Sequence, residues 1–135
     1  MSQTYLSPAV RGPVAGFGIG GQVQVAHGSV AVPSTVATGQ TIGFFDLPAG
    51  AKVLNAVLST PGVGGTAPLS LGDAATSNRF VNAAAAGAAV VANSVAGGIA
   101  HTYAERTRII GTFGTVSGSP TGGTVSATIY YTLDR

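Results

Sequence analysis

The chain has 135 residues, of which only 7% are Asp, Glu, Lys or Arg, whereas an ordinary soluble domain has about 25%. Its net charge of +2 comes from six basic and four acidic side chains, too few for a nucleic-acid-binding face, and its lack of cysteine excludes disulfides. Because a free monomer relies on charge to stay soluble, we expect this protein to be a component of a protein assembly. We expect no nucleic acid among its partners.

Residues 1–21 are predicted to form an extended N-terminal arm, followed by a single β-sandwich domain over residues 22–135. Proline and glycine recur between positions 8 and 21 and are incompatible with a regular helix or strand. Apolar side chains are threaded through this segment, which indicates that the arm lies against a protein surface. The candidate interface residues of the arm are Tyr5, Leu6, Val10, Arg11, Phe17 and Ile19. Residues 16–21 match G-x-G-x-x-G, but no strand precedes them and no helix follows, so no dinucleotide site is predicted.

Alternating polar and apolar residues begin at Gln22 and predict a half-buried strand, with Val23 and Val25 on one face. Further along, the apolar positions change parity, starting at Val30. A change of parity by one residue predicts a bulge, a bend or a turn at Gly28.

Three strands are predicted next in the chain. Residues 42–47 form the first, which ends in a Pro-Ala-Gly turn. Residues 52–60 form the second, with Leu54 on one face and Val53 on the other. A short strand at residues 69–71 ends in Gly-Asp.

The region 78–100, which contains an alanine-rich stretch, is predicted to lack a regular helix. Gly87 interrupts the stretch and no apolar face recurs at helical spacing, so we expect a loop with at most one helical turn, then a strand at residues 90–95. Residues 81–100 are uncharged, but Asn82 and Asn93 are unfavourable in hydrocarbon, so we expect no membrane-spanning helix. The N-terminus lacks a basic start followed by an apolar run, so we expect no secretory signal.

The C-terminal part of the chain is predicted to be extended. Residues 99–107 and 108–115 form two such segments, and residues 117–123 form a turn rich in Gly, Ser and Pro. From Val125 to Leu133 every second residue is apolar, which is typical of a strand with one covered face in an antiparallel sheet. Several short strands, Gly- and Pro-rich turns and no strong helix predict an all-β fold, either a sandwich or a barrel.

Residues with catalytic or metal-binding chemistry are few. His27 and His101 have no carboxylate at a recognised ligand spacing, so neither a metal nor another cofactor is predicted. The chain lacks the G-x-S-x-G elbow of many serine hydrolases, so we predict no enzyme activity. We expect His27 to lie at a bend and His101 on the surface of a strand.

The densest polar cluster spans residues 103–108. On a strand, Arg106 and Arg108 share one face, and Tyr103 and Glu105 share the other. The two arginines are candidate interface residues, because two guanidinium groups on one face can hold the carboxylates of a partner. They are equally compatible with a solvated face or with ion pairs inside the chain.

The acids considered for such pairs are Asp73 and Asp134. A competing arrangement pairs Asp73 with Arg79, so that these two residues close their own loop.

Four stretches of the chain resemble head decoration proteins, also called cement proteins, of tailed bacteriophages. These stretches are residues 41–53 (TIGFFDLPAGAKV), 69–73 (LSLGD), 78–81 (NRFV) and the closing segment 123–133. The resemblance implies a jelly-roll-like antiparallel β-sandwich that forms homotrimers over three-fold positions of a capsid. It also implies that the N-terminal arm lies across neighbouring subunits.

The same resemblance implies a structural virion protein on the capsid surface, which binds the major capsid protein across subunit seams and stabilises the shell. Such a protein is found in the host cytoplasm during assembly and binds neither nucleic acid nor membrane. A competing interpretation is a receptor- or glycan-binding β-sandwich module of a phage tail or adhesin. A third is a small hydrolase that uses a serine, a histidine and an aspartate.

Overall fold

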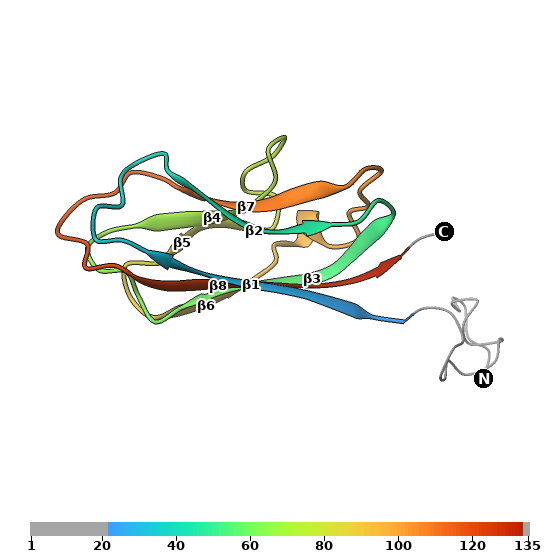
Figure 1. The fold of residues 1–135 in the computed structure, drawn as a ribbon, viewed down its shortest axis with the longest axis horizontal. Helices are drawn as coiled ribbons and strands as arrows, with labels where there is room; N and C mark the ends of the chain where they lie inside the picture. Colours follow the sequence, from blue (N-terminus) through green and yellow to red (C-terminus); the bar gives the residue numbers. More distant parts are fainter. Residues whose placement is uncertain (1–21, 134–135) are drawn as a thin grey trace, which may run out of the picture.

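Two four-stranded antiparallel β-sheets pack face to face in the computed structural model, which describes residues 22–133 (Figure 1). The elements are β1 (Gln24–Val32), β2 (Thr41–Leu47), β3 (Ala51–Thr60), β4 (Pro68–Gly72), β5 (Val81–Ala85), β6 (Val90–Asn93), the 3-10 turn η1 (Ala96–Gly98), β7 (Thr107–Phe113) and β8 (Gly123–Leu133). The predicted all-β antiparallel sandwich is therefore confirmed. The predicted arm, residues 1–21, lies outside the described residues, and its six candidate interface residues lie outside them too.

The strand order is β1-β8-β3-β6 in the first sheet and β2-β7-β4-β5 in the second sheet. Successive strands alternate between the two sheets, except that β4 and β5 are neighbours in the second. The strands at the centre of each sheet thus come from distant parts of the chain, with β8 between β1 and β3 and β7 between β2 and β4. We interpret this eight-strand order as jelly-roll-like.

The hydrophobic core fills the space between the two sheets. In β8 the predicted alternation is confirmed, because Val125, Ala127 and Ile129 are fully buried and the residues between them are not. Large side chains from both sheets and their connections complete the core. The largest fully buried ones are Phe80, Phe113, Leu47, Leu58, Leu69, Leu71, Ile109 and Ile129.

No bulge, bend or turn occurs at Gly28, so that prediction was wrong. β1 pairs with β8 in one continuous register along its whole length. A Cβ atom on Gly28 would lie 2.6 Å from the carbonyl oxygen of Phe44 in β2, so glycine is needed for the close approach of two backbones. The apparent change of parity arises because Val25 faces outward, 55% exposed, whereas Val30 faces the core.

A bulge occurs instead in β3. The pairing of β3 with β8 shifts between Val53 and Asn55, so Leu54 is the extra residue. As a result Val53, Ala56 and Leu58 all face the core, whereas Leu54 is 37% exposed. The predicted division of faces in this strand was therefore wrong, because one inserted residue reverses the alternation that follows it.

The alanine-rich region forms two strands, of which only the second was predicted. β5 pairs with β4 in the second sheet, and β6 pairs with β3 in the first, so this region crosses between the sheets. Ala86, at the crossing, is fully buried and its N–H donates to the carbonyl of Ala67. Backbone pairing with β4 thus overrides the helical preference of alanine. Within residues 22–133, no helix is long and apolar enough to cross a membrane.

Residues 99–106 do not form the predicted strand, because β7 begins only after them. They extend along the edge of β3 instead. The N–H of Ala100 donates to the carbonyl of Val53 at 2.7 Å. The N–H of Tyr103 donates to the carbonyl of Ala51 at 2.9 Å. Because β6 pairs only with the second half of β3, this segment satisfies backbone groups of the first half.

Candidate functional site

The charged side chains of residues 22–133 gather at two places, with Lys52 and Glu105 outside both. The first, called the arginine cluster here, consists of Asp46, Arg106 and Arg108. The second, called the Asp73 network, is built around Asp73 and Arg79. The first is on the surface and the second is inside the protein, so they play different roles.

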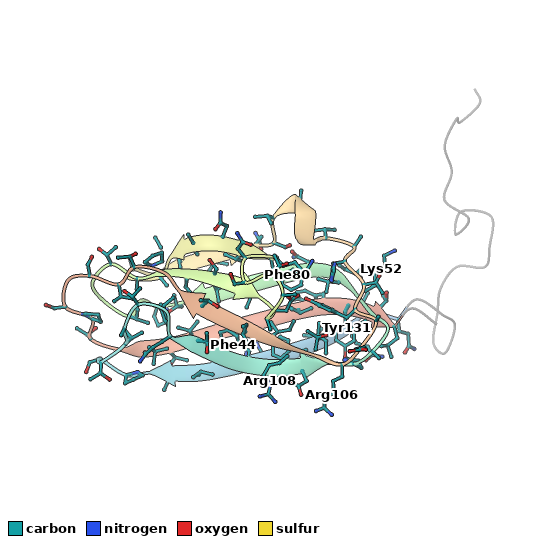
Figure 2. All side chains as sticks on the ribbon, turned by 90° about the horizontal axis from the view of Figure 1, so that it is seen from above. Phe44, Lys52, Phe80, Arg106, Arg108 and Tyr131 are labelled. Carbon is teal, nitrogen blue, oxygen red and sulfur yellow. The ribbon has the colours of Figure 1, made fainter. Side chains whose placement is uncertain are left out.

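The arginine cluster lies where β2 and β7 run side by side. Asp46 is the register partner of Arg108 across the two strands. Arg108 Nε donates to Asp46 Oδ1 at 2.8 Å, and Arg106 Nη2 lies 2.9 Å from Asp46 Oδ2. The side chains of Arg106 and Arg108 are 77% and 68% exposed, and Figure 2 shows both pointing away from the sandwich. The two arginines therefore share one face, as predicted.

The two arginines pair inside the chain, but their acid is Asp46 and not Asp73; Asp134 lies outside the described residues. Asp46 was not predicted as their partner, because only the register of β2 against β7 brings it near the arginines. The hydrogen bond from Arg108 holds the pKa of Asp46 below its usual value, against the opposing effect of desolvation, and Arg106 lowers the pKa further. The cluster therefore presents an excess of positive charge to solvent at neutral pH.

The Asp73 network joins the loop after β4 to the segment after η1. Asp73 is 2% exposed, and its Oδ2 accepts hydrogen bonds from Arg79 Nε and from the Tyr103 hydroxyl, both at 2.7 Å. Its Oδ1 accepts from the Thr76 N–H at 2.8 Å. Arg79 Nη1 also lies 3.2 Å from His101 Nδ1. The predicted Asp73–Arg79 loop closure is thus confirmed, and Tyr103 connects it to a second segment.

Tyr103 does not share a strand face with Glu105, which corrects that prediction. Tyr103 is buried and Glu105 is exposed, because the segment that carries them is not a regular strand. The ring of Tyr103 packs edge-on against His101, with ring centroids 4.6 Å apart, and against Phe80. His101 is therefore half-buried beside the network, and not on the surface of a strand as predicted.

Burial and hydrogen bonding set the protonation states in the Asp73 network. Burial alone raises the pKa of Asp73, but hydrogen bonds from Arg79, Tyr103 and the backbone of Thr76 outweigh it, and the net effect lowers the pKa. Burial and the hydrogen bond to Asp73 raise the pKa of Tyr103, so its hydroxyl remains a donor. Burial lowers the pKa of His101, and the positive charge of Arg79 lowers it further.

The lowered pKa of His101 predicts a loss of stability in mild acid. The unfolded chain, in which the histidine has its ordinary pKa of 6.5, takes up the proton more readily than the folded protein. The free energy of unfolding should therefore have its full value above about pH 6.5 and decrease as the pH falls below it. Urea unfolding curves at a series of pH values measure this decrease. H101Q should flatten it; an unchanged decrease in H101Q would contradict the assignment.

His27 lies in the middle of β1 and not at a bend, so that prediction was wrong. Its Nδ1 lies 2.8 Å from Thr128 Oγ1, and its Nε2 lies 3.3 Å from Ser29 Oγ. Ser29 Oγ also lies 2.8 Å from Ser126 Oγ. These contacts form a surface ladder of side-chain hydrogen bonds between β1 and β8. No group of three or more His, Cys, Asp or Glu residues within 22–133 could hold a metal ion.

The outer face of the first sheet is uncharged apart from Lys52 at one end. Its cross-strand rows are Val25–Tyr130–Asn55, His27–Thr128–Val57 and Ser29–Ser126–Ser59. Large exposed apolar side chains of the described residues occur on the strands of this sheet, just before β1, or in the connection after β6. They are Val23, Val25, Leu54, Val91, Val95, Ile99 and Tyr130. The alternation of β8 indicated its hydroxyl-rich side, but no sequence signal placed the valines of β1 there.

No protein-family model matches the chain, and no curated protein matches it. Solved structures do. A chain of the cyanophage Pam1 capsid asymmetric unit is 28% identical with a TM-score of 0.80, over 98% of this chain and 99% of that chain. A chain of the Ralstonia phage GP4 capsid is 20% identical with a TM-score of 0.65, over 91% and 90%. A chain of the acid-stable capsid of Helicobacter pylori bacteriophage KHP30 is 15% identical with a TM-score of 0.61, over 84% and 90%. The protein is thus similar, along most of its length, to chains found in three phage capsids.

Proposed function

We propose that this protein is a structural component of a bacteriophage virion that decorates and stabilises the capsid. In this proposal it sits on the capsid surface as a homotrimer and binds the major capsid protein across the seams between subunits. It is found in the host cytoplasm only during assembly, and it has no catalytic role. The observation that carries the proposal is the similarity to a chain of the cyanophage Pam1 capsid, which extends over nearly all of both chains.

The scarcity of charge supports the proposal independently. Outside the arginine cluster, the described surface offers few ionised groups that must lose water when a neighbouring protein covers them. A lattice of capsid subunits presents many equivalent binding positions, so each trimer binds through several weak contacts at once. Contacts that bridge a seam then have to break before the subunits separate.

The arginine cluster is the part of this surface best suited to bind a carboxylate of the capsid. Arg106 directs Nε and Nη2 to Asp46, and Arg108 directs Nε to it. Among the described residues, no other acid pairs with these exposed guanidiniums. Their remaining N–H groups can bind a carboxylate with defined geometry. A shallow depression lined by Phe44 and Phe45 adjoins them. The predicted arm, with Tyr5, Leu6, Val10, Arg11, Phe17 and Ile19, supplies the apolar contacts in this proposal.

The proposal is tested by mixing the purified protein with undecorated shells of its phage. We expect electron microscopy to reveal added density over subunit seams and a higher temperature of shell disassembly. Deletion of residues 1–20 or the double change R106A/R108A should weaken this binding, while K52A, which removes one positive charge outside the arginine cluster, should not. Absence of added density would count against the proposal. Reproducible binding on a glycan array by a monomeric protein would favour the receptor-binding alternative.

A further inference from the structure

We infer that the outer face of the first sheet is the surface through which this protein binds a second copy of itself. Identical faces that meet form a two-fold contact, so this contact goes beyond the proposed function and is additional to the three-fold contacts of its homotrimer. That face, called the β8 face here, carries the outward side chains of β1, β8, β3 and β6, the strands that form one layer of the ribbon in Figure 1.

Exposed apolar side chains are distributed unequally between the two sides of the sandwich. Val91 is 71% exposed and Val25 is 55% exposed, and both lie on strands of the first sheet. The second sheet carries no large apolar side chain with comparable exposure among the described residues, and it carries the arginine cluster instead. Apolar groups favour burial and ionised groups resist it, so the β8 face is the side that gains more from being covered.

The polar groups of the β8 face can be satisfied by an identical face. Between the valines lie hydroxyl groups such as those of Ser29, Ser126 and Thr128, which already pair with neighbours. A hydroxyl group both donates and accepts hydrogen bonds, so hydroxyls from two copies can pair in either direction. A partner rich in charged residues would instead have to bury ions against a face that offers only Lys52, at one end, in return. A second copy is therefore the occupant that this chemistry favours.

The β8 face is large enough for a specific contact. Strands lie about 4.8 Å apart and rise about 3.3 Å per residue, so this sheet presents about 500 Å² in projection. Two such faces bury about 1,000 Å² in total, which is the size at which specific protein interfaces begin. Association through this area alone is expected to be moderate, which suits a component that is also held by a shell.

The edge strand β1 of the same sheet also indicates that another copy packs here. β1 is an edge strand of nine residues with a continuous register and no charge, proline or bulge. Within the described residues it therefore lacks the features that keep native edges from pairing. The other edges are protected, since β2 has a bulge near Phe44 and carries Asp46, and β5 and β6 are short. An unprotected edge beside an uncharged face is expected where another copy packs.

Thr128 and Thr112 allow a matched test of this assignment. Both are half-buried threonines that point outward from a central strand, Thr128 on the β8 face and Thr112 on the opposite face. Sedimentation velocity of the full chain over a range of concentrations measures self-association. We expect Thr128→Asp to raise the dissociation constant about 100-fold, because two like charges meet in the contact, and Thr112→Asp to leave it within a few-fold.

A second pair of variants guards against misfolding. Val25→Asp changes an exposed residue of the β8 face, and Thr41→Asp changes an exposed residue of the opposite face; neither disturbs the core. Because the chain has no cysteine, Thr128→Cys introduces a single thiol whose labelling rate should fall as the protein associates. The thiol of Thr112→Cys should be labelled at the same rate throughout.

The inference is overturned if the protein stays monomeric at all concentrations, or if changes on the two faces weaken association equally. Binding of each variant to undecorated shells is measured separately. Shell binding that persists while the β8 face proves irrelevant to association would reject the inference and leave the proposed function standing. Absence of added density on the shells, together with self-association through the β8 face, would reject the proposed function and leave the inference standing.

Discussion

Replacing Asp73 with alanine is expected to lower the free energy of unfolding by about 3–5 kcal/mol, because it removes one partner of a buried ion pair. The change leaves Arg79, whose side chain is only 20% exposed, without its carboxylate, and it leaves the buried Tyr103 hydroxyl without its acceptor. It also releases the backbone N–H of Thr76. Urea unfolding at one fixed protein concentration measures the loss, since self-association would otherwise add to the apparent stability.

Asp46 provides the matched control for this change. Asp46 also pairs with two side chains, those of Arg106 and Arg108. Both arginines are on the surface, where ion pairs add little to stability. We therefore expect Asp46→Ala to have a much smaller effect than Asp73→Ala. Asp73→Asn, which keeps the shape and some acceptors, should fall between them. Equal losses for the two alanine variants would mean that the Asp73 network does not stabilise the fold.

Replacing Phe80 with alanine is the second change with a large expected effect, a loss of about 3–5 kcal/mol from the cavity left by a buried aromatic ring. Phe80 is fully buried. Its N–H donates to the carbonyl of Leu71, and its carbonyl accepts from the N–H of Val95. Backbone hydrogen bonds therefore hold Phe80 between the loop after β4 and the approach to η1, and its buried ring fills the core at this position.

Phe80→Leu should be tolerated better, with a loss of about 1.5 kcal/mol or less, because most of the buried volume is kept. Phe45→Ala should also cost less than Phe80→Ala, because Phe45 is only partly buried at the margin of the core. Thermal unfolding gives an independent measure, with a fall in Tm of about 10 °C or more expected for Phe80→Ala. A loss as small for Phe80→Ala as for Phe45→Ala would contradict the expectation that the Phe80 ring contributes more to the core than the partly buried Phe45 ring.

The two clusters of charged residues differ in how far the sequence could predict them. Asp73 and Arg79 lie within one loop, so their pairing was open to prediction from local spacing, and it is observed. Asp46 and Arg108 meet only because β2 and β7 are neighbours in the second sheet. The sequence of neither segment specifies that register, so Asp46, the acid that pairs with the candidate interface arginines, was not predicted.

The sequence alone determined that the protein is all-β and poor in charge, because the alternation of side chains along a strand shows which of them face a core. The clearest case is β8, whose alternating residues are buried and partly exposed as predicted. Only the tertiary structure decided where alternation is interrupted: the bulge at Leu54, and the need for glycine at position 28 against Phe44. It also decided that Val25 faces outward and that alanines 83–85 join a strand. The physical reason is that pairing partners and the closeness of the two sheets depend on residues far apart in the chain, which local periodicity cannot encode.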